Sequence, residues 1–331
     1  RLADQLGDAA NARAWVEEGR LIAEQAGDPA ALALAADSLA MIEIAAGRPA
    51  EALACANACI RLARRAGHPI ARLLPEDDAG GWATVDPLAL KATASALAKE
   101  QDRSPERTGS AAEALSIDVA SAINDIGLAQ VLLGDLTAAR GALSSSLIVR
   151  EAAGNTMDIA ISCSNLGYVL LLQGEAQAAV NTLERALRLQ EADQSVYGAW
   201  PILQNLAIAL NALGSFDRAA EMAIRCCRDA RDYGIGAGVF NGLTALLVIE
   251  ANRGSDIRAA TLLGVTERMS ESGQNPLLGY ERQLRDEAVS RIAAALGPAD
   301  LAAAVAAGRA MSEDAVVAMI SSTPDSGRSL L

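Results

Sequence analysis

Apolar residues along the chain recur with the period of a helix. In residues 157–173, apolar side chains fall at positions i, i+4, i+7 and i+11, which lie on one face of a helix. These positions are Ile159, Cys163, Leu166 and Leu170. No proline interrupts the stretch, so the pattern predicts an amphipathic helix.

Four such segments, spaced forty residues apart, lie between Ile117 and Pro276. A glycine follows each segment, and an alanine stands five residues after each glycine. Glycine accepts the left-handed backbone that ends a helix, and alanine lets a second helix pack closely against the first. We expect one antiparallel helix pair per period, stacked on its neighbours because one pair cannot bury its own apolar face. The glycines are Gly134, Gly174, Gly214 and Gly254, and the alanines are Ala139, Ala179, Ala219 and Ala259.

The residue after three of these glycines predicts where the second helix of the pair begins. Asp135, Ser215 and Ser255 each carry a side-chain oxygen that can accept a hydrogen bond from the first turn of that helix. We therefore expect them to cap it.

One copy of the repeat resembles a known family. Asn165-Leu166-Gly167, followed by Ala179, Leu183 and Ala186, is similar to the tetratricopeptide repeat. The resemblance implies an all-α fold, a right-handed superhelix of antiparallel helix pairs. The unit lacks the family's closing proline and is about six residues longer than the 34-residue standard. That length resembles the long-helix variant of large bacterial regulators.

The period defines the expected organisation of the chain. Gly7 and Gly47 are also forty residues apart, so we assign residues 1–276 to tetratricopeptide-like repeats. We interpret residues 70–116 as a degenerate unit, because prolines and an Asp-Asp-Ala-Gly-Gly run forbid a regular first helix there; a functional insertion is the other interpretation. One helix is expected at 88–100, and a loop at 101–109. Capping helices are expected within 277–320, at 280–296, 300–307 and 312–320, and 321–331 is expected to be a flexible tail.

A second resemblance covers the end of the chain. The stretches 258–265 and 308–312, Arg-Ala-Ala-Thr-Leu-Leu-Gly-Val and Gly-Arg-Ala-Met-Ser, are similar to the C-terminal tetratricopeptide regions of bacterial STAND-type ATPase regulators, often tied to LuxR-like DNA-binding domains. No helix-turn-helix pattern follows Ile320. Because the chain begins at Arg1 within a helical pattern, we expect a fragment of a longer polypeptide, with any such domain upstream.

This resemblance implies a non-catalytic sensor or protein-interaction module of a larger signalling ATPase or transcriptional regulator. The alternative is a free-standing tetratricopeptide scaffold or a peptide-pheromone receptor.

The composition and charge of the chain exclude some classes of binding partner. The 331 residues are 51% apolar and 3% aromatic, with a net charge of −13, and strand-forming residues do not cluster, which favours an all-α chain. A surface with this much negative charge repels the phosphate backbone of a nucleic acid. We therefore expect no direct nucleic-acid contact from this segment. Charges interrupt every long apolar run, and no secretory leader is present, so we expect a cytoplasmic protein without a membrane partner.

Little in the chain indicates catalysis. Cys55 and Cys59 have a spacing that can hold a metal, but His68 is the only histidine, so we interpret the five cysteines as buried reduced thiols. The glycines at 234–238 look like a dinucleotide fingerprint but follow a helix rather than a strand. No phosphate-binding loop or Ser-His-Asp set occurs. We expect no enzyme activity, no cofactor and no metal.

The remaining candidate is a binding surface on the concave face, where the resemblance places the first helix of each pair. Amide side chains can both donate to and accept from an extended peptide, and aromatic residues at 197, 200 and 240 stand nearby. We expect a protein or peptide partner, including other domains of the same polypeptide; packing between helices is the other interpretation. The candidate contacts are Asn124, Asn165, Tyr168, Trp200, Gln204, Asn205, Asn211, Phe240 and Asn241.

Overall fold

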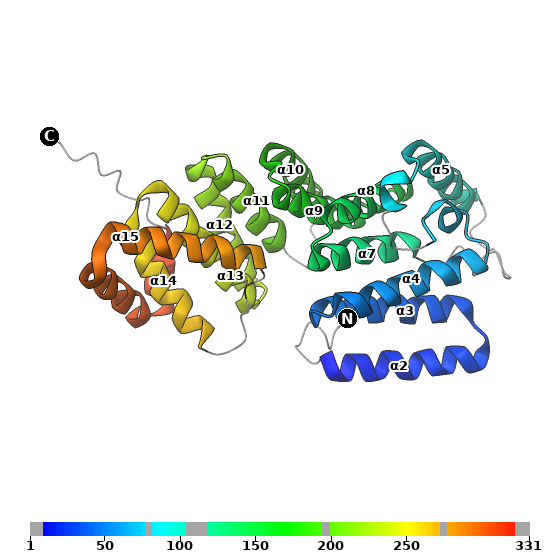
Figure 1. Ribbon diagram of the computed structural model, residues 1–331, viewed down its shortest axis with the longest axis horizontal. Coiled ribbons are helices and arrows are strands. Elements are labelled where there is room, and N and C mark those ends of the chain that lie inside the picture. Colours follow the sequence, from blue (N-terminus) through cyan, green and yellow to red (C-terminus); the bar gives the residue numbers. More distant parts are fainter. Residues whose placement is uncertain are drawn as a thin grey trace. The chain divides into compact units, whose positions relative to one another are not determined.

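A computed structural model describes residues 9–76, 81–103, 118–193, 199–271, 277 and 279–321, and these ranges contain helices and turns but no strand. The chain divides into two compact units, residues 1–173 and 174–331 (Figure 1). The first unit contains α2 (Ala9–Ala26), α3 (Pro29–Ala45), α4 (Pro49–Arg65), α5 (Pro87–Arg103), α7 (Val119–Leu133), α8 (Leu136–Ala153) and α9 (Thr156–Leu172). The second contains α10 (Ala176–Asp193), α11 (Trp200–Ala212), α12 (Phe216–Asp232), α13 (Gly236–Arg253), α14 (Asp256–Ser270), α15 (Gly279–Ala310) and α16 (Glu313–Ser321).

The forty-residue period is confirmed as a period of helix pairs. Each of its four glycines lies in the left-handed region, with φ between 71° and 85°. The alanines five residues later are all fully buried. Within each unit, most helices that follow one another along the chain pack together, and α5 packs on α8. The fold is therefore all-α, built of stacked antiparallel helix pairs.

Helix capping follows the prediction at Asp135 and departs from it at two serines. The Asp135 side chain accepts a hydrogen bond from the Ala138 N–H at 2.9 Å. The expectation was wrong for Ser215 and Ser255, which make no such bond. Their ψ angles are 57° and 58°, against 78° for Asp135. At that less extended backbone angle, the serine oxygen does not meet the amides of the first turn.

Glycines inside the first helix of a pair allow that helix to approach a neighbouring second helix, either of its own pair or of the pair before it. A Cβ added to Gly127 of α7 would lie 2.6 Å from Cγ of Leu143 on α8. A Cβ added to Gly242 of α13 would lie 2.6 Å from Sγ of Cys227 on α12. Both distances are shorter than any ordinary contact, so a side chain at either position would push the helices apart.

Tertiary contacts hold the described part of the degenerate unit, which was assigned to residues 70–116. Two single 3₁₀ turns, at Ile70–Leu73 and Gly81–Thr84, precede α5, which extends the helix predicted at 88–100 by one residue at its start and by three at its end. Trp82 is buried against Gly141 of α8. Arg64 donates to three carbonyl oxygens of this segment, each at 3.0 Å. Most of the predicted loop at 101–109, like Gly7 and the tail beyond Ser321, lies outside the described residues.

The last helices follow the predicted pattern. The run named α15 is two helices, because Gly297 inside it has φ 74° and ψ 171° and Pro298 follows. Among the described residues, this run alone is long and apolar enough to be a candidate for crossing a membrane, on length and composition. The break divides it into pieces shorter than the roughly 20 residues that a span needs.

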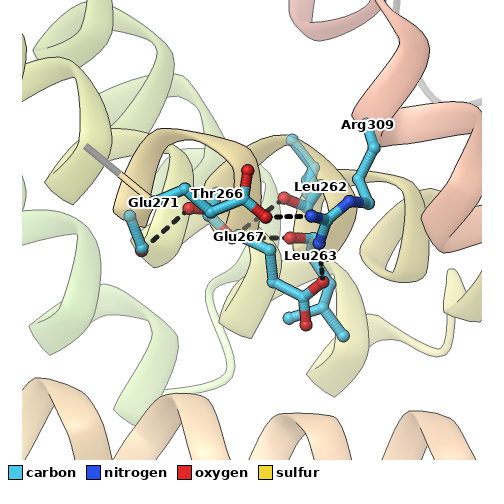
Figure 2. Close-up of polar contacts among 7 residues, drawn as sticks. Leu262, Leu263, Thr266, Glu267, Glu271 and Arg309 are labelled. Carbon is cyan, nitrogen blue, oxygen red and sulfur yellow. Dashed lines mark hydrogen bonds and ion pairs between the residues drawn. The ribbon is translucent and has the colours of Figure 1, made fainter. Parts of the chain in front are cut away.

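The second half of α15 crosses α14 at two glycines. A Cβ on Gly264 would lie 2.0 Å from the carbonyl oxygen of Val305, and a Cβ on Gly308 would lie 1.9 Å from that of Thr261. Beside the crossing, Arg309 makes ion pairs with Glu267 at 3.0 Å and with Glu271 (Figure 2). The two stretches that resemble the regulators thus dock the last helices on the preceding pair.

We predict that Gly264→Ala lowers the free energy of unfolding by about 1–3 kcal/mol or more, because two helix backbones must separate to admit the methyl group. Urea denaturation of the whole chain measures the change. Gly19→Ala is the matched control, since a Cβ at this exposed position within α2 meets no atom within 4 Å. The control should stabilise by about 0.5–1 kcal/mol through helix propensity. A neutral Gly264→Ala would contradict the close crossing.

Candidate ligand-binding face

In the first unit, polar side chains connect the first helices of successive pairs. The Ser121 hydroxyl on α7 donates to Oδ2 of Asp37 on α3 at 3.2 Å. The Asn165 amide on α9 donates to Oδ1 of Asn124 on α7 at 2.9 Å. We call this set the polar row; it consists of Asp37, Asp118, Ser121, Asn124, Asp125 and Asn165. It runs across three helices that are otherwise rich in buried alanine, leucine and isoleucine.

The acidic end of the polar row borders a cavity of about 220 Å³. Asp37 and Asp118 line it together with Cys59 and residues of α3. One carboxylate oxygen of Asp118 also accepts the Ser121 N–H at 2.9 Å, which caps α7. A concave space lined by two carboxyl groups and apolar side chains favours a cationic or hydrogen-bond-donating guest.

Asp125 lies deepest in the polar row. It is 3% exposed, and its Oδ2 has no hydrogen-bond partner among the described residues. Burial, followed by the nearby Asp37, raises the pKa of Asp125 well above its usual value, and the hydrogen bond from Asn124 and the charge of Arg150 only partly oppose this. Arg150 donates instead to the Asp158 carbonyl oxygen at 3.1 Å and to the Ser162 hydroxyl at 3.0 Å. The row therefore favours a protonated Asp125.

Three buried thiols and the imidazole of His68 are shielded from solvent. Burial raises the pKa of the Cys59 and Cys226 thiols, and raises that of Cys227 to about 12. Burial also lowers the pKa of His68 to about 4. At neutral pH these thiols are protonated and the imidazole is uncharged, which makes them poor nucleophiles and a poor proton relay.

In the second unit, the first half of α15 covers the corresponding helix face. Gln204 on α11 and Asn241 on α13 line a space of about 10 Å³, room for no more than a water molecule. Leu277, Glu281 and Leu284 line its other side. The amides here thus face a narrow space.

A second amide pair in this unit repeats the geometry of the first. The Asn252 amide on α13 donates to Oδ1 of Asn211 on α11 at 3.0 Å, and Arg291 of α15 donates to Oδ1 of Asn252. The partners in both pairs are 41 residues apart. A separation of 41 residues, which is one period plus one residue, therefore places an amide on the first helix of one pair opposite an amide on the first helix of the next pair.

The nine candidate contacts fall into two groups. Asn165, Tyr168, Trp200, Asn205 and Asn241 are half-buried and keep some surface. Four others are at most 8% exposed: Asn124, Gln204, Asn211 and Phe240. Phe240 belongs to the core, and the ring of Trp200 lies over Gly238, so these aromatics pack between helices. Tyr197 lies outside the described residues.

The structure brings some candidates together and adds others. Asn124 meets Asn165, and Gln204 shares a cavity wall with Asn241. Sequence reasoning missed the partners Asp37, Ser121, Asp125, Asn252 and Arg291. The 41-residue spacing of amides could have identified Asn252, whereas no local signal marks a charged residue that meets another helix.

The comparison with protein families agrees with the fold. Residues 160–193 match the model of a tetratricopeptide repeat, a scaffold for protein interactions in general. No curated protein matches the chain. A crystal structure of nearly identical TPR-like repeats, named as a kinesin light chain of Podosopora anserina, is similar, with 13% identity, a TM-score of 0.48, and 74% of this chain and 97% of that chain covered. A likeness at this level identifies neither a ligand nor a partner.

We predict that Asp125→Asn raises the melting temperature, and more so at pH 7.5 than at pH 4.5. Because the folded pKa of Asp125 is raised, the folded state binds its proton more tightly than the unfolded state does. The stability that this proton provides is present at low pH, and is lost as the pH rises above about 4, the unfolded value, toward the folded pKa. Asparagine keeps an acceptor for Asn124 and has no proton to lose.

Calorimetry of the whole chain at the two pH values measures the difference. Glu18→Gln, at an exposed position in α2, removes the same charge from a solvated site and should change the melting temperature little at either pH. A gain for Asp125→Asn that is largest at pH 4.5 would contradict a protonated Asp125.

Proposed function

We propose that this chain is a non-catalytic protein-interaction module, and that the first helices of its pairs bind a protein segment or peptide. The polar row is the observation that carries the proposal. Hydrogen-bonding groups cross α3, α7 and α9 from helix to helix, and Asn165 and Tyr168 at its edge keep exposed surface. An extended backbone offers the donors and acceptors that such a row matches.

The acidic character of the row favours a basic or neutral partner. Asp37 and Asp118 line its cavity, and the whole chain has a net charge of −13. A partner with lysine, arginine or a free amino group would neutralise these carboxylates, while an acidic peptide would be repelled. Such binding should weaken as salt is added.

We further propose that the module belongs to a larger cytoplasmic signalling ATPase or transcriptional regulator, with another domain of the same polypeptide among its partners. In this arrangement α15 and α16 cap the repeats. The resemblance of 258–265 and 308–312 to such regulators supports the context. Binding would bias the larger protein between two states by its different affinity for them.

We predict that Asn165→Ala combined with Asn205→Ala weakens binding of a basic peptide roughly tenfold, because each lost hydrogen bond contributes about 0.5–1.5 kcal/mol. The peptide would be selected against the whole chain from a random library, and its affinity measured by titration calorimetry. Both asparagines are half-buried, so the fold should persist, as circular dichroism would show.

Gln177→Ala combined with Asn181→Ala is the matched control. These two amides lie on α10, the second helix of a pair, where they bond to each other at 3.0 Å in an exposed position. The control should bind like the unaltered chain. Equal affinities for all three proteins would place the binding site elsewhere and leave the polar row a structural feature.

A further inference from the structure

The second unit contains a cavity that is separate from the amide-bearing face. Its volume is about 380 Å³, and its walls come from α12, the start of α13, the end of α14, and α16. The walls are mostly aliphatic, with Leu243, Val265, Val316 and Ile320 all buried. The volume lies within the range of pockets that hold small organic ligands, roughly 300–1,000 Å³.

The rim of this cavity carries positive charge in a strongly negative chain. Arg228, Arg231 and Arg268 line it, and Glu313 is the one carboxylate that the described residues contribute to the lining. Arg268 is already engaged, since it donates to the carbonyl oxygens of Arg309, at 2.9 Å, and of Met311. Arg228 has a weak bond to the Ser321 hydroxyl at 3.4 Å, and Arg231 a 3.4 Å ion pair with its neighbour Asp232. Two guanidinium groups are therefore available at the rim.

The start of α13 adds to the positive potential. Ile235, the residue before its first turn, makes no side-chain capping bond, and residues 234–236 line the cavity. A Cβ on Gly236 would meet no atom within 4 Å, so the backbone there is accessible. Free N–H groups at the start of a helix favour an anion, as do the arginines.

We propose that this cavity binds a small amphipathic anion: a medium-chain fatty carboxylate whose alkyl chain lies among the aliphatic walls and whose carboxylate meets Arg228 and Arg231. Among the described residues, the lining contains no aromatic ring, so an aromatic ligand would have nothing to stack on. A linear aliphatic chain matches the valine, leucine, isoleucine and methionine walls. The three-to-one excess of arginine over carboxylate at the rim selects an anionic head group over a neutral or cationic one.

Titration calorimetry with decanoate, well below its micelle concentration, tests the proposal on the whole chain. We expect saturable binding at one site. Shortening the ligand to octanoate and hexanoate should weaken it roughly fourfold per methylene, as about 0.8 kcal/mol per buried CH₂ implies. Decanol should bind roughly tenfold more weakly than decanoate, because a neutral hydroxyl loses the charge-assisted bonds.

Two sets of variants locate the site. Arg228→Gln with Arg231→Gln should remove the preference for decanoate over decanol. Val317→Trp, at a half-buried position of α16 that lines the cavity, should fill the space and abolish binding of both ligands. The arginine pair is exposed, so that variant stays informative even if Val317→Trp fails to fold.

Arg218→Gln with Arg225→Gln is the matched control. It removes the same charge from the same helix, at residues that pair with Glu184 and Glu191 outside the cavity, and should leave both affinities unchanged. No saturable decanoate binding, an equal loss in this control, or unchanged binding in a folded Val317→Trp protein would each overturn the proposal.

Discussion

The structure depends on how closely neighbouring helices can approach. At Gly127, Gly242 and Gly264, an added Cβ would overlap an atom of the adjoining helix, and the alanines of the forty-residue period are fully buried at the crossings. Aromatic residues make up only 3% of the chain. The core is therefore stabilised by many short contacts between small side chains and backbones rather than by a few large rings.

Close approach also explains where the polar groups lie. When helices stand near one another, even short side chains can bridge them, so serine, asparagine and aspartate hydrogen-bond from helix to helix. Asn165 and Asn124 do so in the first unit, and Asn252 and Asn211 in the second. Longer side chains bridge neighbouring helices at the surface, as Arg309 of α15 does with Glu267 of α14. Because buried amides satisfy each other, part of the face expected to meet a ligand is already used inside the fold.

The periodic features were the predictable ones. The glycine and alanine spacing identified the helix pairs, and Gly297-Pro298 identified the break in α15. The burial of Trp82 was not predictable, because it depends on Gly141 of a helix about sixty residues away. The covering of Gln204 by Leu277 and Glu281 was equally hidden, since nothing in the pattern of α15 says which face it packs against. The cavity between α12, α13, α14 and α16 likewise exists only once four separate segments have packed.

The break at Gly297 has a mechanical consequence. The first half of α15 lies against α13, where Glu281 borders the narrow space that Gln204 of α11 also lines, and Arg291 reaches Asn252. The second half is locked to α14 through Gly308 and leads into α16, a wall of the larger cavity. A continuous helix would transmit a displacement of one of these two places to the other. With a joint at a backbone angle that glycine adopts at little cost, a displacement of α16 would bend the chain at Gly297 rather than lift Glu281 from its neighbours.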